Sequence, residues 1–407
     1  MAKPPNPKRR SLPLPDWRSG LPEDLLESIG QRLASGHDTT SFRSACSPWR
    51  AAIPFATFGP LLLLPFDPDS DCVGFYCVPE KKVLSKTLPD LRGKVACGSS
   101  CGWLALIDEA ASVTLLNPFA GARTPRVELP PAGEHIAAAS SSERVSRVHD
   151  WWVLHPTNGY GDADAAGRAI KLEDRRDVFF CEIVLSASPD AAGRECVAMA
   201  MLGCSTEVAF CRVGVDSAWT LLDTKLEFSV GSIVHCQDKF LAIDCTGEIS
   251  VCSSNAGGAT PTAALLPSLS PPAGLCHRSY LESNGELHIV GAMMSTFHET
   301  RSFTYSSAIY KCNLHARMPE WSRARDIGDQ TLFMSKHFNE SFSGTSVSKY
   351  KENKIYMSEP LYGDPYDLVH RLKIVDIATG ASEVKTVQKK MQGSEALGWI
   401  RPNLWKL

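Results

Sequence analysis

The chain has 407 residues, of which 43% are hydrophobic and 21% charged, and its formal net charge is −3. This is the composition of a globular protein with enough apolar material for a core, and the length suits two domains, or a small module with one large barrel or propeller. A nearly balanced charge provides no strong field for nucleic acid or a membrane surface, so we expect neither as a partner.

The first residues carry no targeting or membrane signal. They are charged and rich in proline, without the apolar core of a signal peptide, and no later stretch of about 18 apolar residues predicts a membrane helix. Residues 1–15 are predicted to be a disordered leader, and the basic run within it is interpreted as solvated or as a weak nuclear signal. The 14 cysteines are therefore expected to be reduced thiols, and the chain to reside in the nucleus, the cytoplasm or both.

Residues 16–58 predict a small helical module. Pro22 suits the first position of a helix, where its missing N–H costs nothing, and the acidic pair after it suits the positive end of the helix dipole. Apolar residues then follow at helical spacing. This stripe consists of Leu21, Leu25, Leu26, Ile29 and Leu33.

A second helical stretch begins near Asp38, and Pro48 should end or kink it. Its apolar face contains Phe42, Ala45, Cys46 and Trp49. About forty residues cannot bury much surface alone, so the module needs a partner protein or a neighbouring domain to cover its leucines.

From residue 59 to residue 407 the apolar period changes from 3.6 towards 2, which predicts a large all-β domain. A strand, a turn and a second strand recur at separations of 137, 47 and 68 residues, which are close to three units of about 46, one unit, and one unit with an insertion. A period of 40–50 residues is typical of propeller blades. The four pairs are Gly102–Ile107 with Val113–Asn117, Lys239–Ile243 with Glu248–Cys252, Glu286–Val290 with Ala308–Cys312, and Lys354–Met357 with Arg371–Asp376.

Two tryptophans favour a kelch-like type of blade. Trp219 and Trp321 each precede the next strand pair, as a tryptophan late in one blade would. The fold class expected is therefore a small all-α module followed by a large all-β domain, a kelch-like β-propeller whose blade count stays open. An irregular β-sandwich is the alternative.

The helical module resembles an F-box. The matching residues are Asp16-Trp17, Leu21 to Leu26, Ile29, Arg32-Leu33, Asp38, Phe42-Arg43, Ala45-Cys46 and Trp49-Arg50. The resemblance implies binding to a Skp-type adaptor of a cullin-RING ubiquitin ligase, and it assigns adaptor contact to Leu21, Pro22, Leu25, Leu26, Ile29 and Leu33. It assigns Phe42, Cys46 and Trp49 to the core of the module. A helical cap on the propeller is the alternative.

The rest of the chain resembles the KIB-type propeller that follows F-boxes in a large plant family. The resemblance is carried by Leu91–Leu106 with Leu116–Phe119, by Lys239–Asp244 and by Gly398–Trp405. It implies a non-catalytic substrate receptor that recruits an unknown protein, and it identifies no substrate-contacting residue. The alternatives are an F-box scaffold without a ligase, and an enzyme or ligand sensor whose acids, histidines or serines converge on the propeller channel.

Known catalytic and metal motifs are weak in this sequence. Gly98–Gly102 matches the G-x-S-x-G elbow with Ser100 as nucleophile, but a strand rather than the required helix follows, so a β-turn is expected. Cys97 and Cys101 lack a second pair at zinc spacing. We therefore expect no catalytic residue, cofactor or metal.

Overall fold

The computed structural model describes a large part of the chain, in ranges separated by gaps. The described residues are 21–30, 32, 42, 45–51, 59–108, 110–119, 125–131, 145–148, 151–154, 168–169, 180–191, 193–203, 205–254, 256–266, 269–297, 302–335, 338–343, 350–359, 369–389 and 398–402. The chain divides into two compact units, one of Met1–Phe58 with Thr345–Lys349 and one of Gly59–Gly344 with Tyr350–Leu407. In these ranges no helix combines the length and apolar character needed to cross a membrane.

The small unit contains helices α1 (Glu23–Gly30) and α3 (Ser47–Ala51). The carbonyl of Pro22 accepts the backbone N–H groups of Leu25 and Leu26, both at 3.1 Å, so the proline directly precedes α1, one residue before the helical position that the sequence predicted for it. The leader at residues 1–15 and the start of the second helical stretch near Asp38 lie outside the described residues.

The predicted break in the second helical stretch is present. Phe42 and Ala45 are helical, the helix is interrupted at Cys46, and a new helix begins at Ser47. Pro48 falls in the first turn of this short helix, where no intrahelical partner for its nitrogen is required.

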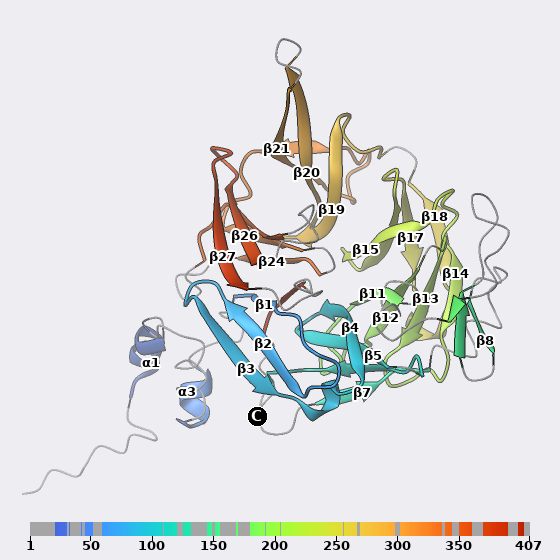
Figure 1. Cartoon of the computed structure of the whole chain (residues 1–407), viewed down its shortest axis with the longest axis horizontal. Coiled ribbons are helices and arrows are strands. Elements are labelled where there is room, and N and C mark those ends of the chain that lie inside the picture. The colour runs from blue at the N-terminus through green and yellow to red at the C-terminus, as the bar shows by residue number, and fades with distance from the viewer. Residues whose placement is uncertain are drawn as a thin grey trace, which may run out of the picture. The chain divides into compact units, whose positions relative to one another are not determined.

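The large unit is a six-bladed β-propeller in the part of the chain that the structure describes, and its blades are arranged around a common centre (Figure 1). The first blade has a strand from each end of this unit, and the next two are built from continuous segments. From the innermost strand outward, blade 1 is β28 (Gly398–Ile400), β1 (Leu61–Leu63), β2 (Cys72–Cys77) and β3 (Lys82–Thr87); blade 2 is β4 (Lys94–Ser100), β5 (Trp103–Asp108), β6 (Val113–Leu116) and β7 (Arg126–Glu128); blade 3 is β11 (Phe180–Leu185), β12 (Val197–Leu202), β13 (Glu207–Arg212) and β14 (Thr220–Asp223).

The remaining three blades complete the ring, and the last has five strands because β23 pairs in parallel with β25. Blade 4 is β15 (Val230–Cys236), β16 (Lys239–Asp244), β17 (Ile249–Ser253) and β18 (Thr262–Leu265); blade 5 is β19 (Leu275–Ser283), β20 (Glu286–Phe297), β21 (Ser302–Cys312) and β22 (Ser322–Ala324); blade 6 is β24 (Glu340–Ser343), β23 (Gln330–Met334), β25 (Lys354–Glu359), β26 (Val369–Asp376) and β27 (Ser382–Lys389).

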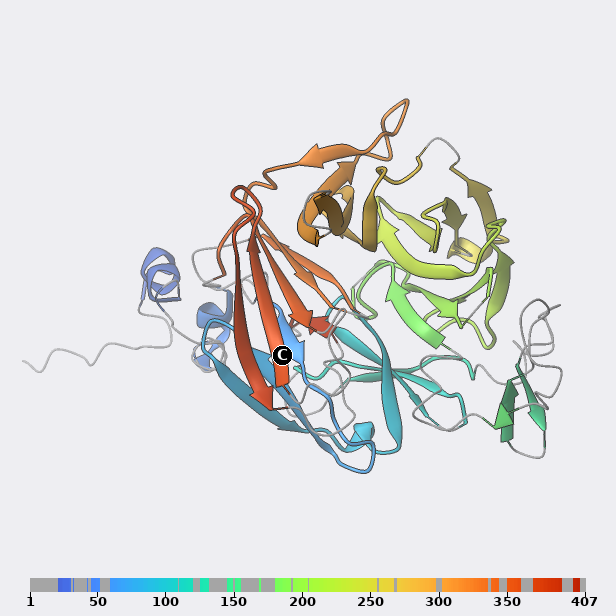
Figure 2. The same cartoon turned by 45° about the horizontal axis from the view of Figure 1, so that its top comes forward.

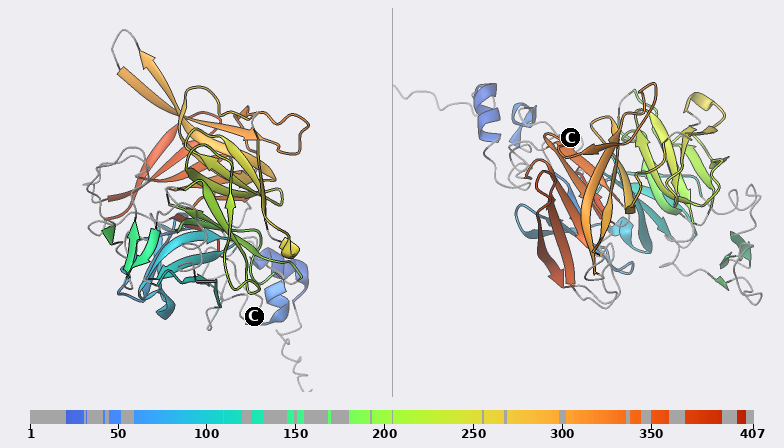
Figure 3. Two further views of the ribbon diagram at one scale, coloured as in Figure 1. Left: turned by 90° about the vertical axis from the view of Figure 1, so that its right-hand side faces the viewer. Right: turned by 90° about the horizontal axis from the view of Figure 1, so that it is seen from above.

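Three smaller features accompany the blades. A three-stranded sheet of β8 (Val145–Val148), β9 (Trp151–Leu154) and β10 (Arg168–Ala169) lies outside the ring (Figure 2). The β20–β21 hairpin projects beyond its neighbours (Figure 3). Two short 3-10 helices, η2 (Pro89–Leu91) and η3 (Ala256–Gly258), complete the described elements.

Three of the strand pairs found in the sequence are the second and third strands of their blades: β5–β6, β16–β17 and β20–β21. The fourth pair, β25–β26, consists of the third and fourth strands of the five-stranded blade 6. The two tryptophans, Trp219 and Trp321, lie directly before the outermost strands of blades 3 and 5. The propeller prediction is confirmed and the sandwich alternative is excluded, whereas the kelch-like type stays a prediction.

The apolar core of the propeller lies between the blades. Among the described residues six buried clusters are found, each shared by two neighbouring blades, including one between blades 6 and 1. Successive side chains of β1 pack against opposite neighbours. Leu61 and Leu63 pack towards blade 2, while Leu62 packs towards blade 6. Strands covered on both faces are continuously apolar, because successive side chains point to opposite neighbours.

The ring is closed by pairing β28 with β1. Leu61 pairs with Ile400, Leu62 with Trp399 and Leu63 with Gly398 in antiparallel register. Trp399 is fully buried, and its indole N–H donates to the carbonyl of Met334 in blade 6 at 2.9 Å. The two ends of the propeller sequence therefore belong to one sheet.

Position 398 in the closing strand must be glycine, because the neighbouring side chain leaves no space for a Cβ. A Cβ there would lie 2.6 Å from the Cβ of Phe338, which no side-chain rotation relieves. Phe338 and Gly398 also form a parallel bridge, so the contact joins blade 6 to blade 1.

Loss of the closing indole should destabilise the whole propeller. Trp399→Ala removes a fully buried ring and its hydrogen bond, which costs about 3–5 kcal/mol in the free energy of unfolding. Urea denaturation followed by circular dichroism measures this. Val384→Ala, at a side chain 55% exposed on β27, should change the same quantity by less than about 0.5 kcal/mol. Equal effects of the two substitutions would contradict the closure.

Candidate functional site

Some of the residues predicted to contact the adaptor are buried within the helical unit, and others are exposed. Leu26 is 3% exposed and Phe42 7%, and together they form the core of the module. Leu21 and Trp49 are partly buried against them, and the rings of Phe42 and Trp49 are 4.5 Å apart between centroids. Leu26 is thus a packing residue of the module.

Leu25 and Ile29 are the exposed apolar residues of α1, at 48% and 40% of their surface. A spacing of four puts them on the same face of the helix. Pro22 is also exposed, whereas Cys46 is partly buried. Leu33 lies outside the described residues. Burial of these apolar side chains is favourable, and it can occur only when a partner covers the exposed face of the helix.

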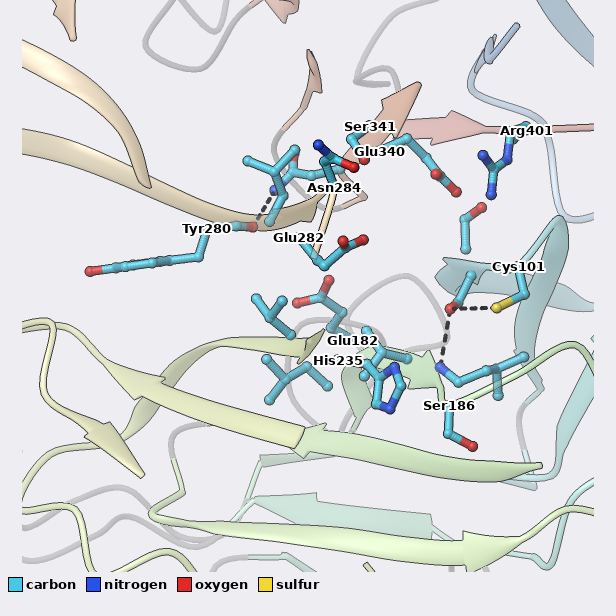
Figure 4. Close-up of a pocket in the computed structure, with 18 of the residues that line it drawn as sticks. Cys101, Glu182, Ser186, His235, Tyr280, Glu282, Asn284, Glu340, Ser341 and Arg401 are labelled. Carbon is cyan, nitrogen blue, oxygen red and sulfur yellow. Dashed lines mark hydrogen bonds between the residues drawn. The ribbon is translucent and has the colours of Figure 1, made fainter. Parts of the chain in front are cut away.

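The propeller contains a central cavity of about 410 Å³. Its lining comes from the innermost strands of blades 2 to 6 and from Arg401, which follows β28 (Figure 4). This volume lies within the usual range of small-molecule sites, about 300–1,000 Å³. Side chains distant in sequence therefore meet at the centre of the ring.

Three carboxylates line this cavity, each from a different blade: Glu182 on β11, Glu282 on β19 and Glu340 on β24. Burial raises the pKa of Glu182 to about 8, although its carboxylate accepts the backbone N–H of Ile233, which acts in the opposite direction. Burial also raises the pKa of Glu340, against the nearby positive charge of Arg401. The enclosure therefore disfavours the ionised carboxylates.

Two further titratable groups of the cavity are uncharged at neutral pH. Burial lowers the pKa of His235 on β15, which keeps the imidazole neutral, and burial raises the pKa of the Cys101 thiol to about 11. Cys101 is thus a thiol rather than a nucleophilic thiolate. Among the described residues that line the cavity, Arg401 is the only cation.

The hydroxyls at the end of β4 differ in their bonding. Ser100 accepts the backbone N–H of Leu185 at 3.1 Å and lies beside the Cys101 thiol. Ser99 is 9% exposed, and its hydroxyl has no hydrogen-bond partner. A buried hydroxyl without a partner costs free energy, so an unpaired one in a cavity wall is an open position for a ligand.

The G-x-S-x-G stretch is a β-turn between two strands, as expected. Cys101 and Gly102 have φ of 53° and 81°, the combination of a tight hairpin turn. Gly98 serves a different purpose, because a Cβ there would lie 2.6 Å from the carbonyl oxygen of Ile183 on the neighbouring inner strand. Ser100 is therefore part of a hairpin, not of a nucleophile elbow.

No group of three histidine, cysteine or acidic residues in the described ranges could hold a metal ion. The described cysteines, Cys97 and Cys101 included, form no disulfides with one another.

Sequence reasoning missed the cavity because its groups are scattered over five blades. Glu182 is the one charged residue of the otherwise apolar strand Phe180–Leu185, whereas Glu282 lies in Leu275–Ser283, a strand with several other polar residues. A charged residue within an apolar strand can be recognised from the sequence, but only the closed ring shows that the polar residues of different blades face one another. The convergence expected of a ligand sensor or enzyme is thus present.

Comparison with known proteins agrees with the fold. The family model described as KIB1-4 beta-propeller matches residues 75–383, most of the six-bladed unit. The chain belongs to this family. As a KIB1-4 beta-propeller protein it is similar to three Arabidopsis thaliana proteins along most of their length.

These relatives are named F-box proteins. Putative F-box protein At5g55150 is 28% identical over 80% of this chain and 80% of its own length. F-box protein At2g26160 is 23% identical over 79% of this chain and 89% of its own, and F-box protein SKIP23 is 24% identical over 82% and 81%. The similarity supports an F-box and propeller protein from plants.

Stability should depend on pH through Glu182. The pKa of Glu182 is higher in the folded than in the unfolded chain. The contribution of this side chain to folding stability is therefore greatest at low pH, and it falls as pH rises from about 4.3 to about 8. Glu182→Gln removes this loss and should increase the free energy of unfolding by about 1–3 kcal/mol at pH 8, with a smaller gain at pH 5.

Urea denaturation at both pH values measures the difference. Glu227→Gln, at an exposed position outside the cavity, should change stability little at either pH. A gain for Glu182→Gln that is the same at pH 5 and pH 8 would contradict the burial of its charge.

Proposed function

We propose that this chain is the F-box substrate-recognition subunit of an SCF-type cullin-RING E3 ubiquitin ligase. Its helical unit binds a Skp-type adaptor, and its propeller recruits a target protein. The observation that carries the proposal is the exposed pair Leu25 and Ile29 on α1, next to Leu26, which anchors the helix to its own module. The F-box names of the relatives support it.

The division of labour within α1 has a physical basis. Leu26 packs on Phe42 and fixes the helix, so the exposed pair is presented on a rigid surface. Covering each exposed side chain contributes roughly 1.5–3 kcal/mol if burial is complete. A few such contacts, with polar contacts at their rim, provide the free energy of a specific complex.

The chain supplies proximity rather than chemistry in this proposal. Holding a target near the charged ubiquitin carrier raises its effective concentration, and other subunits perform the thioester transfer. The projecting β20–β21 hairpin and the other loops around the ring provide the surface for the target. We place this activity in the nucleus, the cytoplasm or both.

Replacing Leu25 and Ile29 together by aspartate tests the adaptor surface. Two charges in an apolar interface should weaken adaptor binding by at least about 100-fold, because burying them unpaired costs more than the lost contacts. Titration calorimetry of the purified full chain with a Skp-type adaptor measures this, and circular dichroism confirms that the β signal is retained.

Two matched variants separate contact from folding. Val215→Asp, at a propeller side chain 62% exposed, should leave adaptor affinity unchanged. Leu26→Ala should loosen the module and lower affinity together with the helical signal. Undiminished adaptor binding by the doubly substituted chain would exclude this helix face as the interface, and a reconstituted ubiquitin-transfer assay distinguishes a ligase subunit from a scaffold.

A further inference from the structure

We propose that the central cavity of the propeller binds a small organic cation, an ammonium or guanidinium compound. The enclosing groups come from five blades and from Arg401, and none belongs to the helical unit. Such a ligand site goes beyond the proposed ligase role and does not rest on it.

The charge of the lining selects a cation. Among the described residues the cavity has three carboxylates and a single cationic side chain, Arg401. Arg401 favours the ionised form of Glu340, whose charge it offsets. Glu182 and Glu282 have no cationic partner among the described lining residues, so the cavity offers a positive group two acidic side chains that no protein cation offsets.

The position of these two groups suits a ligand. Figure 4 shows Glu182 and Glu282 extending from their strands into the space between the blades. The backbone N–H of Gly285 donates to one oxygen of Glu282 at 2.6 Å, which fixes the side chain. Glu182 is fixed likewise by the N–H of Ile233. Both carboxylates keep further lone pairs for a planar guanidinium or an ammonium group.

A second and independent feature of the cavity wall also calls for a ligand. The hydroxyl of Ser99 is buried without a hydrogen-bond partner, although Ser100 beside it is paired. A polar organic molecule that reaches this hydroxyl would satisfy it with a hydrogen bond. Ser99 thus provides a polar contact besides the charges.

The size and donor set favour an organic cation over a metal ion. A volume of about 410 Å³ is that of a small-molecule site and far exceeds one ion. The described lining contains no group of three metal-binding side chains. The occupant therefore carries its charge on a larger body that fills the space between the inner strands.

Binding should be coupled to proton release. Glu182 is largely protonated at pH 7 because burial raises its pKa to about 8, and a cation beside it restores the ionised form. The titratable groups that line the cavity with it are Cys101, His235, Tyr280, Glu282, Glu340 and Arg401. Affinity should accordingly rise between pH 6 and pH 8.

The test uses the full chain with n-butylguanidinium as the probe and n-butylurea, its uncharged counterpart of equal shape, as the control. Titration calorimetry in two buffers of different ionisation enthalpy measures affinity and proton release together. We expect saturable millimolar binding of the cation, at least tenfold weaker binding of the urea, and up to one proton released at pH 7.

Substitutions locate the site. Glu182→Gln should weaken binding at least tenfold and abolish the proton release, and Ser99→Ala should weaken binding a fewfold. Glu227→Gln, exposed and outside the cavity, should change neither. Thermal denaturation of each unliganded variant shows that it is folded, and Ser99→Ala tests the site separately if Glu182→Gln alters the fold.

Four results would overturn the proposal. The first three are equal binding of n-butylguanidinium and n-butylurea, no saturable binding of the cation up to about 50 mM, and binding that Glu182→Gln leaves unchanged. Tighter binding of an acetylated Gly-Arg-Gly amide than of n-butylguanidinium would also overturn it, because the cavity would then hold a basic side chain of a recruited protein.

Discussion

The pairing of β28 with β1 is the constraint on which the rest of this structure depends. Each blade has a core only because another blade covers it, and the six buried clusters among the described residues of the propeller all lie at blade–blade boundaries. Blade 1 takes its innermost strand from the far end of the chain, and this strand needs to fit against blade 6 beside the side chains of β1 that contact it. Trp399 and Gly398 meet this need, the first by filling the boundary and the second by leaving room for Phe338.

Closure also creates the polar centre of the ring. The inner strands pack apolar side chains against both neighbouring blades, and they also carry Glu182, Glu282 and Glu340, which line the cavity. Burying Glu182 costs stability, as its raised pKa shows. A cost of this kind is typical of a binding site. The two proposals thus divide the chain, with α1 serving the adaptor and the propeller contributing a target surface and a ligand cavity.

The sequence predicted the middle strands of the blades better than the inner ones, for a physical reason. β5, β16 and β20 are regular apolar runs that pair without interruption with the strands after them. The inner strands β4, β11, β15 and β19 each contain a register shift against the second strand of their blade. A bulge breaks the period of two, and the polar residues facing the cavity weaken it further. The helix beginning at Pro22 was predictable from its stripe, but the burial of Leu26 and the exposure of Leu25 depend on Phe42, which no local pattern reveals.

Native-state hydrogen exchange followed by mass spectrometry tests most directly whether closure holds the ring together. If it does, the amides of β1 and β28 exchange in the same cooperative step as those of β4 and β24, with the same free energy of opening. Exchange of β28 at a much lower free energy than the inner strands of the other blades would contradict this, because the ring would then persist with its closing strand detached.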